Sequence, residues 1–365
     1  MSAEKIGKIE AICLMLIIVV NELIINVPNM IILDTKTGST LNIFYVSILA
    51  VIFTYIICRL FKPFYGKDIL DVSEYVGGEI LKTILGILFL LFFIFLSSIN
   101  LRYFANSLKV IYFNTSPLVY ILLFFLIPAL HVNKYGLRAI SGVNLIFLPI
   151  ILASFIFLMI SSYDNFTMVR IFPILGEGFN ETFIRGATNI FAFTGLSFIY
   201  FLPALLKNSK DFKKVSVISV IISAVCLILS ILSLIMAFPA ITKTDETLSV
   251  YLLTRLVELG DFLERLDALF IFIWIIAHIS FLSLTFFYIL KIFQKITKIE
   301  DSRTLTSTLG LIVLSSSLIY KDIAELKFIA RFFLKYSTLI LIFVICFGVL
   351  ILGNIKYKRK NKNNS

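Results

Sequence analysis

The series of long apolar segments constrains this chain more than any other feature. A helix needs about 20 largely apolar residues to cross a membrane, and ten segments approach or exceed that length. They are 9–33, 41–60, 82–112, 117–131, 140–162, 183–206, 215–239, 267–292, 305–320 and 330–355. The fourth and ninth are short, and the third is long enough to tilt strongly. The pattern predicts an all-α integral membrane protein with about ten transmembrane helices.

Composition argues against a soluble alternative. The chain is 59% hydrophobic and 15% charged, whereas a soluble domain has about 45–50% apolar and about 25% charged residues. The net charge of +11 would suggest nucleic acid in a soluble protein, but here the basic residues lie mostly in short loops between apolar segments. We therefore expect contact with membrane lipid and no binding of nucleic acid.

The Lys and Arg residues also predict the orientation of the spans, because cytoplasmic loops carry an excess of both. With the N-terminus in the cytoplasm, most of the 33 Lys and Arg residues lie on the cytoplasmic side. This predicts one membrane domain over 1–365, with cytoplasmic termini, a retained signal anchor at 9–33 and a basic, disordered tail at 356–365. Four basic residues between the last two segments are predicted outside and form the exception: Lys321, Lys327, Arg331 and Lys335.

Two connections carry apolar residues at helical spacing. Residues 68–78 are expected to form a short amphipathic helix at the membrane interface. Residues 245–264 form a longer amphipathic segment. That segment either caps the outer mouth of a pathway or lies on the lipid headgroups.

Polar residues and a proline interrupt the first apolar segment. Asn21, Glu22 and Asn26 fall near mid-membrane, where polar side chains are costly unless they face a partner or a cavity. Pro28 removes one backbone donor, and irregular backbone in a membrane must lie against protein or a water-filled cavity. We expect a broken helix whose backbone, Ile25 included, contributes to a ligand site. The alternative is a proline kink with polar groups satisfied by neighbouring helices.

The sixth apolar segment has a comparable interruption. Thr194, Gly195 and Ser197 follow Phe193 as a small polar patch near its middle, and Pro203 comes after them. Gly195 is compatible with local unwinding of the helix or with close packing of a neighbouring helix. Unwinding would place the backbone of 193–197 in the ligand site.

The two interrupted segments each begin a set of five. Because five is odd, the second half (183–355) would run opposite to the first (1–162), which is the arrangement of an inverted repeat. Interrupted helices at corresponding positions mark a ligand site near the membrane midplane. Their free amides and half-helix dipoles suit the carboxylate and ammonium groups of an amino acid.

The third segment places polar residues on one helical face. Asn100, Tyr103 and Ser107 recur at three- and four-residue spacing, so that face is expected to line a pathway. Arg102 and Lys109 are expected to extend to the outer interface.

The eighth segment carries Asp267, Trp274, His278 and Thr285 on a shared face. His278 lies deep in the predicted span. Its imidazole is predicted either to contact the ligand or titrate, or to form a structural hydrogen bond across helices.

No catalytic constellation is visible. His131 is predicted in a loop, and the four cysteines lie apart in or beside apolar segments: Cys13, Cys58, Cys226 and Cys346. We therefore expect no metal, no cofactor and no enzymatic activity.

Two stretches of sequence resemble a known family. Residues 191–214 (FAFTGLSFIYFLPALLKNSKDFKK) run from the small polar patch through a proline into a basic loop. Residues 262–275 (FLERLDALFIFIWI) open the eighth segment with Glu264, Arg265, Asp267 and Trp274. With the ten-span layout, they resemble the B subunit of spore germination nutrient receptors, within the amino acid–polyamine–organocation transporter superfamily.

The resemblance implies a LeuT-like fold, a 5+5 inverted repeat with broken first and sixth helices. It also implies a receptor complex in the spore inner membrane, with a larger A subunit and a lipoprotein C subunit. The B subunit would sense a germinant, commonly an amino acid, in the cavity between the broken helices. The chain departs from the pattern in two places. Leu196 and Ser197 follow Gly195 where relatives often carry an acidic residue, and Asn21 and Glu22 stand where transporters prefer glycines.

The sequence therefore predicts a germinant receptor subunit that binds a small nutrient, with an ion-coupled secondary amino-acid transporter as the alternative. The predicted ligand-binding residues are Asn21, Glu22, Ile25, Asn26, Asn100, Tyr103, Phe193, Thr194, Gly195, Ser197 and His278.

Overall fold

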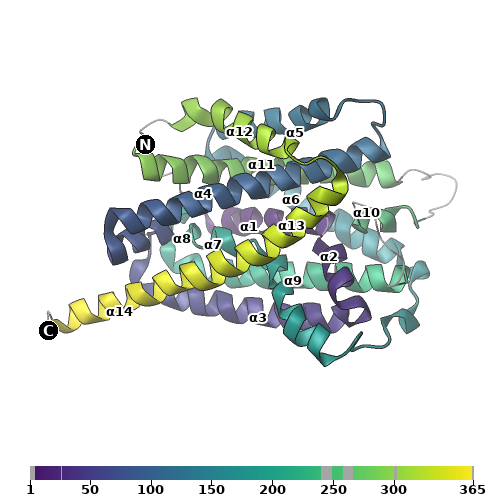
Figure 1. Ribbon diagram of the computed structural model, residues 1–365, viewed down its shortest axis with the longest axis horizontal. Helices are drawn as coiled ribbons and strands as arrows, with labels where there is room; N and C mark the ends of the chain where they lie inside the picture. Colours follow the sequence, from purple (N-terminus) through teal and green to yellow (C-terminus); the bar gives the residue numbers. More distant parts are fainter. Residues whose placement is uncertain (1–4, 26, 240–248, 258–265, 300–301, 364–365) are drawn as a thin grey trace.

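Long helices make up most of the computed structural model, which describes residues 5–25, 27–239, 249–257, 266–299 and 302–363 (Figure 1). The α-helices are α1 (Lys8–Ile25), α2 (Val27–Thr35), α3 (Ser39–Leu60), α4 (Ile69–Ile111), α5 (Leu118–Asn133), α6 (Leu137–Ser161), α7 (Leu196–Ile199), α8 (Leu202–Leu205), α9 (Phe212–Ala237), α10 (Ser249–Thr254), α11 (Leu266–Thr297), α12 (Thr306–Leu318), α13 (Ile323–Ser337) and α14 (Phe347–Asn363). A π-helix, η9 (Thr338–Cys346), joins α13 to α14.

Each predicted apolar segment overlaps a helical element. Among the described residues, six helical stretches are long and apolar enough to cross a membrane: Val27–Leu60, Ile69–Ile111, Leu137–Ser161, Ser209–Ala237, Asp267–Thr297 and Ile323–Lys362. Two shorter apolar helices, Leu118–Asn133 and Thr306–Leu318, match the segments predicted to be short. The chain is therefore an integral membrane protein, and the all-α prediction is confirmed.

The first span is broken at its predicted position. The helix α1 ends at Ile25 and a separate helix, α2, begins at Val27; Asn26 lies outside the described residues. Pro28 is the second residue of α2. An amide in the first turn of a helix has no partner within the helix, so proline is tolerated there. The proline thus opens α2 rather than kinking one continuous helix.

The sixth span begins without α-helical geometry. It starts as a π-helix, η5 (Asn180–Ile184), continues as a 3₁₀-helix, η6 (Arg185–Phe193), and then forms the short helices α7 and α8. Asn42 of α3 supports this irregular backbone by donating from Nδ2 to the carbonyls of Thr182 (2.7 Å) and Gly186 (2.9 Å). Such external donors are required where a backbone in a membrane lacks its own pairing. No pattern in the sequence indicates this role of Asn42.

The broken first span lies in the middle of the bundle. The helix α1 contacts α6, α9 and α11, while α4 packs against α11, α12 and α14 (Figure 1). The backbone of Ile6 pairs with the end of the sixth span, through 2.9 Å hydrogen bonds with Leu205 and Lys207. The two interrupted spans are therefore joined near the N-terminus.

A short helix lies at 68–78, as predicted. The helix α4 begins at Ile69, and non-helical backbone at Gly77 and Gly78 separates its first two turns from the long helix that follows. The prediction for the end of the chain needs correction. The 356–365 tail is not disordered over its described part, since α14 extends to Asn363. Lys356 helps to hold this helix in place by donating to the carbonyls of Tyr75 (2.7 Å) and Val76 (3.2 Å).

The structure also corrects predictions elsewhere in the bundle. The basic segment before the tenth span is the amphipathic helix α13, and it runs into that span. Arg102 does not extend to the interface, because it is buried and donates to the carbonyls of Ser317 (3.4 Å) and Tyr320 (3.1 Å) at the end of α12. His131 lies in the last turn of α5 rather than in a loop. Of the predicted 245–264 segment, the structure describes only 249–257, which contains α10.

Candidate functional site

A chain of hydrogen bonds crosses the bundle just before the break in the first span. Asn21 of α1 donates from Nδ2 to Oδ1 of Asn100 on α4 (2.9 Å), and its Oδ1 lies 2.8 Å from Nδ1 of His278 on α11. In this arrangement His278 donates from Nδ1, because the amide oxygen of Asn21 only accepts. The three residues, all buried, fix the end of α1 between the third and eighth spans.

His278 has an aromatic environment. Its ring stacks on Phe104 with centroids 4.4 Å apart and meets Phe125 edge-on at 5.3 Å. Its Nε2 is buried and has no hydrogen-bond partner among the described residues. Of the two predicted roles, the hydrogen bond across helices is the one that the geometry shows.

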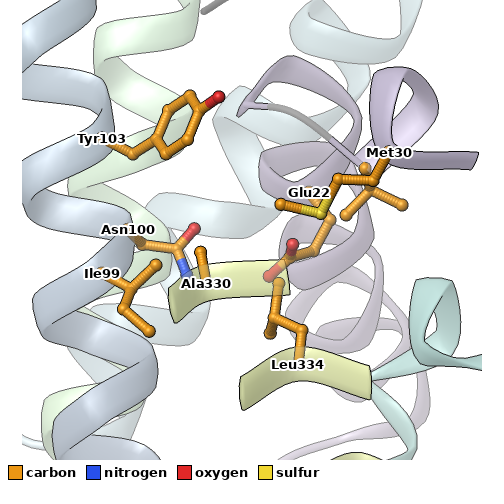
Figure 2. Close-up of a pocket in the computed structure, with 8 residues that line it drawn as sticks. Glu22, Met30, Ile99, Asn100, Tyr103, Ala330 and Leu334 are labelled. Atoms are coloured by element: carbon orange, nitrogen blue, oxygen red, sulfur yellow. The ribbon is translucent and has the colours of Figure 1, made fainter. Parts of the chain in front are cut away.

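A small cavity lies where the break faces α4 and α13 (Figure 2). The cavity has room for about one water molecule. Its walls come from Glu22, Val27, Met30, Ile99, Asn100, Tyr103, Ala330 and Leu334. The space is therefore too small to hold an amino acid without movement of its walls.

Two polar groups at this cavity lack partners. Oε1 of Glu22 and the hydroxyl of Tyr103 are both buried and have no hydrogen-bond partner among the described residues. Figure 2 shows the Glu22 carboxylate directed toward α4, with Ala330 and Leu334 alongside. Among the described residues that line the cavity, Glu22 carries the only acidic group and none is basic. A buried polar group without a partner costs about 1–3 kcal/mol, and a water molecule or a polar ligand atom in the cavity would relieve that cost.

The predicted residues of the sixth span lie outside this lining. The hydroxyl of Thr194 donates to the carbonyl of Phe191 and lies 3.4 Å from that of Thr338, while Ser197 donates to the carbonyl of Thr194 (2.8 Å). Phe193 is buried in the core. These hydroxyls therefore satisfy local backbone and do not face the cavity.

Gly195 marks a close approach between the two broken spans. A Cβ atom at this position would lie 3.5 Å from Cγ2 of Ile18 and 3.7 Å from Cγ2 of Val19, both on α1. Of the other predicted residues at the first break, Ile25 is the last residue of α1 and Asn26 is outside the described part of the chain. The structure thus brings Glu22, Asn100 and Tyr103 to one cavity and places Asn21 and His278 directly behind it.

Ion pairs close one end of the site. Asp34 of α2 accepts from Arg331 and Lys335, which lie four residues apart on α13. The same helix supplies Ala330 and Leu334 to the cavity wall, so these ion pairs hold that wall against the broken span. The spacing of the two basic residues was visible in the sequence, but nothing there identified Asp34 as their partner.

The opposite end is closed by a second set of contacts. Lys295, near the end of α11, lies 2.6 Å from carboxylate oxygens of both Asp68 and Asp71 at the start of α4. The amide of Ile69 donates to the carbonyl of Tyr200 (3.0 Å), between α7 and α8. The hydroxyl of Tyr200 in turn donates to the carbonyl of Ile342 in η9 (2.7 Å).

One contact docks the short helix α10 on the eighth span. The hydroxyls of Tyr251 and Tyr112 donate to Oδ2 of Asp267, at 3.1 Å and 3.0 Å. Burial, together with the neighbouring Tyr112 and Asp267, raises the pKa of the Tyr251 hydroxyl above its usual value. Among the described residues, no group of three or more His, Cys, Asp or Glu side chains is placed to hold a metal ion.

The irregular first and sixth spans define the architecture of a LeuT-like fold. A family model described as "Spore germination protein" matches residues 5–326. The chain belongs to this spore germination protein family.

Curated relatives agree with this assignment. Spore germination protein B2 of Bacillus subtilis (strain 168) is 24% identical over 244 residues, and spore germination protein YndE of the same organism is 23% identical over 241 residues. Each match covers 66% of both chains, so it spans just under two thirds of the relatives' length.

Two solved transporters share the fold. The nucleobase-cation-symport-1 family transporter Mhp1, closed with bromovinylhydantoin bound, has a TM-score of 0.61 at 14% identity, covering 93% of this chain and 78% of its own. A Na⁺-coupled sialic acid symporter in a substrate-bound, outward-open state has a TM-score of 0.65 at 12% identity, covering 96% and 79%. The predicted LeuT-like fold with broken first and sixth helices is therefore confirmed.

Proposed function

We propose that this chain is the membrane subunit of a germinant receptor, which binds a small nutrient, an amino acid, in the cavity at the first break. The observation that carries the proposal is the pairing of that break with the buried, partnerless groups of Glu22 and Tyr103. Membership of the spore germination family supports a role in germination rather than in uptake. The proposed location is the spore inner membrane, with both termini cytoplasmic.

Binding must be accompanied by opening, because the cavity has room for about one water molecule. In the proposed mechanism the closed state exchanges with an open state that admits the nutrient. A ligand shifts such an equilibrium only through its difference in affinity for the two states. Closure around the nutrient would then move α2 and α13. Partner subunits in contact with the chain would respond to this movement. The proposed partners are an A-type subunit and a C-type lipoprotein subunit.

The second candidate function is ion-coupled secondary transport of an amino acid. It is favoured by one observation, the likeness of the fold to a solved nucleobase-cation-symport-1 family transporter and a solved Na⁺-coupled symporter. Both functions use the same cavity, so the closed geometry does not distinguish them.

Deletion of the gene in its spore-forming host separates the two functions. Spores of the deletion strain would be tested against a panel of single amino acids, and vegetative cells would be tested for uptake of the same compounds. We expect loss of the response to one nutrient with its uptake intact. Normal germination with impaired uptake would instead establish the transporter.

A further inference from the structure

Exposed apolar side chains gather in the connection between α6 and the sixth span. We call residues 168–184 the outer segment; it contains the 3₁₀-helix η4 (Met168–Ile171) and the π-helix η5. Its exposed large apolar side chains are Met168, Val169, Phe172, Ile174, Leu175, Phe179 and Ile184. Apolar side chains gathered on an exposed segment mark contact with lipid or with another protein.

The backbone of the outer segment is fixed at both ends, so these side chains belong to a built surface and not to a loose loop. Near its start, Arg170 donates from Nη1 to the carbonyls of Met236 (2.8 Å) and Ala237 (2.6 Å) at the end of α9. Near its end, the hydroxyl of Thr182 donates to the carbonyl of Leu175 (2.9 Å). The one strongly basic side chain of η4 is thus turned inward, while its apolar neighbours point outward.

The middle of the outer segment docks on the turn between α2 and α3. The hydroxyl of Thr37 donates to the carbonyl of Pro173 (2.8 Å). Gly176 has φ 57°, and a Cβ atom there would lie 2.7 Å from both the amide nitrogen of Gly38 and the carbonyl oxygen of Thr35. Because backbone meets backbone at this contact, the outer segment and the end of α2 are held together as one unit.

The exposed apolar surface of the outer segment continues the lipid-facing side of α3. This helix belongs to the membrane-spanning stretch Val27–Leu60, and it carries exposed apolar residues on one face, at spacings of four, four and three: Phe44, Ile48, Ile52 and Tyr55. Phe183 of η5 packs edge-on against Tyr45 of α3 at 5.3 Å, and Phe179 lies 4.9 Å from Phe183. Figure 1 shows η5 and η6, in teal, at the edge of the bundle beside α3.

The backbone and charges of the outer segment define its depth in the membrane. Irregular backbone exposed to lipid is not tolerated in the hydrocarbon core, and charges are costly there. The outer segment contains an exposed Glu177, and its Glu181 is paired with Arg185 (2.7 Å). Headgroups and water at the interface satisfy such groups, and the same zone favours aromatic side chains.

We propose that the outer segment is an anchor in the membrane interface, with Phe172 and Phe179 inserted at the boundary between headgroups and acyl chains. Its partner is the lipid surface and not another protein, because its apolar face continues the lipid-facing side of α3. Through the contact of Gly176 with Gly38, the anchor fixes the level of the α2 end in the membrane. This inference concerns a surface outside the cavity and does not depend on the proposed receptor function.

Tryptophan fluorescence of the full chain in lipid vesicles tests the proposal. The natural Trp274 is 1% exposed, and its emission, measured in the parent chain, would be subtracted. Phe172→Trp and Phe179→Trp would be reconstituted separately in vesicles of phosphatidylcholine and phosphatidylglycerol. The quenchers would be phosphatidylcholine brominated on the upper acyl chain, or iodide on both sides of the vesicle. We expect brominated lipid to remove most of the added emission and iodide to remove little.

Tyr163→Trp is the matched control, because Tyr163 lies in the 3₁₀-helix η3 (Tyr163–Asn165) just before the outer segment and is 68% exposed. We expect iodide to quench this variant more than brominated lipid does. The same pattern in Phe172→Trp and Phe179→Trp would overturn the proposal. Emission that neither quencher reaches would also overturn it, because a second copy of the chain would then cover the surface.

Thiol labelling provides a second readout with a smaller side chain. Phe172→Cys, Phe179→Cys and Tyr163→Cys would be treated in the same vesicles with a charged, water-soluble thiol reagent present on both sides. The reaction needs the thiolate, which apolar surroundings disfavour, and the four natural cysteines are buried. We expect Tyr163→Cys to react fastest and the two anchor positions to react several times more slowly. Equal rates at the three positions would contradict the anchor.

Discussion

Single side chains decide how the broken first span is held. Asn21 connects α1 to both α4 and α11, and it does so with the two ends of one amide group. Interhelical hydrogen bonds of this kind contribute about 0.6 to 2 kcal/mol in membranes. The polar side chain of Asn21 therefore has hydrogen-bond partners on neighbouring helices. The sequence predicts this arrangement as the alternative to a ligand contact. Glu22, one residue later, is directed into the cavity instead (Figure 2).

Gly195 provides a test at the scale of one residue. Gly195→Ala should preserve germination, because its Cβ would meet Ile18 and Val19 at ordinary contact distances of 3.5 Å and 3.7 Å. Gly195→Leu should abolish the response while the protein stays in the membrane, since a larger side chain would force the broken spans apart. Germination assays with immunoblots of spore membranes would measure both effects. A normal response from the leucine variant would contradict the site assignment.

At the scale of elements, the kink in α4 depends on backbone geometry. Gly78 has φ 72° and ψ −165°, a conformation that is almost restricted to glycine and costs other residues about 1–3 kcal/mol. Gly78→Ala should therefore destabilise the protein, although a Cβ there would meet nothing within 4 Å.

Gly142 in α6 is the matched control for that substitution. A Cβ at Gly142 would also meet open space, but this residue lies inside a regular helix. Gly142→Ala should be neutral or stabilising by up to about 1 kcal/mol. The midpoint temperatures of thermal unfolding of the two purified variants in detergent would be compared. Equal effects of the two substitutions would show that the kink does not require the backbone conformation of glycine at position 78.

The contact between α2 and α13 gives a second test at this scale. Asp34→Asn removes the charge that holds Arg331 and Lys335. We expect the cavity to open more often and Leu334→Cys, in its wall, to react faster with a soluble thiol reagent. The natural cysteines of the chain are all buried and provide a low background. An unchanged labelling rate would mean that these ion pairs do not control access.

At the scale of the whole molecule, the described ends of the chain lie toward the same end of the bundle (Figure 1). This arrangement agrees with an even number of spans. We expect cysteines placed at Lys5 and Lys360 to be protected from a membrane-impermeant thiol reagent in intact cells. A cysteine at Tyr163, which is exposed between α6 and the sixth span, should react. Labelling of either terminal position from outside would reverse the predicted orientation.

Local patterns predicted much of the molecule. The spans followed from apolar length, because a helix that crosses lipid must satisfy its own backbone. The two breaks followed from polar residues, glycine and proline that fit poorly in such helices. Predictions failed where helices continue past the apolar stretch, as in α13 and in α14 beyond Lys356. Hydropathy indicates which residues can lie in lipid, but it does not show where a helix ends once its residues become amphipathic or polar.

The sequence by itself determined the membrane class, the helices and the positions of the two breaks, since these depend on the properties of consecutive residues. Only the tertiary structure decided which polar groups meet: Asn21 with Asn100 and His278, Asp34 with Arg331 and Lys335, and Asn42 with the sixth span. It also separated Glu22 and Tyr103, which face the cavity, from Thr194 and Ser197, which do not. These partners are far apart along the chain, and their meeting depends on the packing and rotation of whole helices.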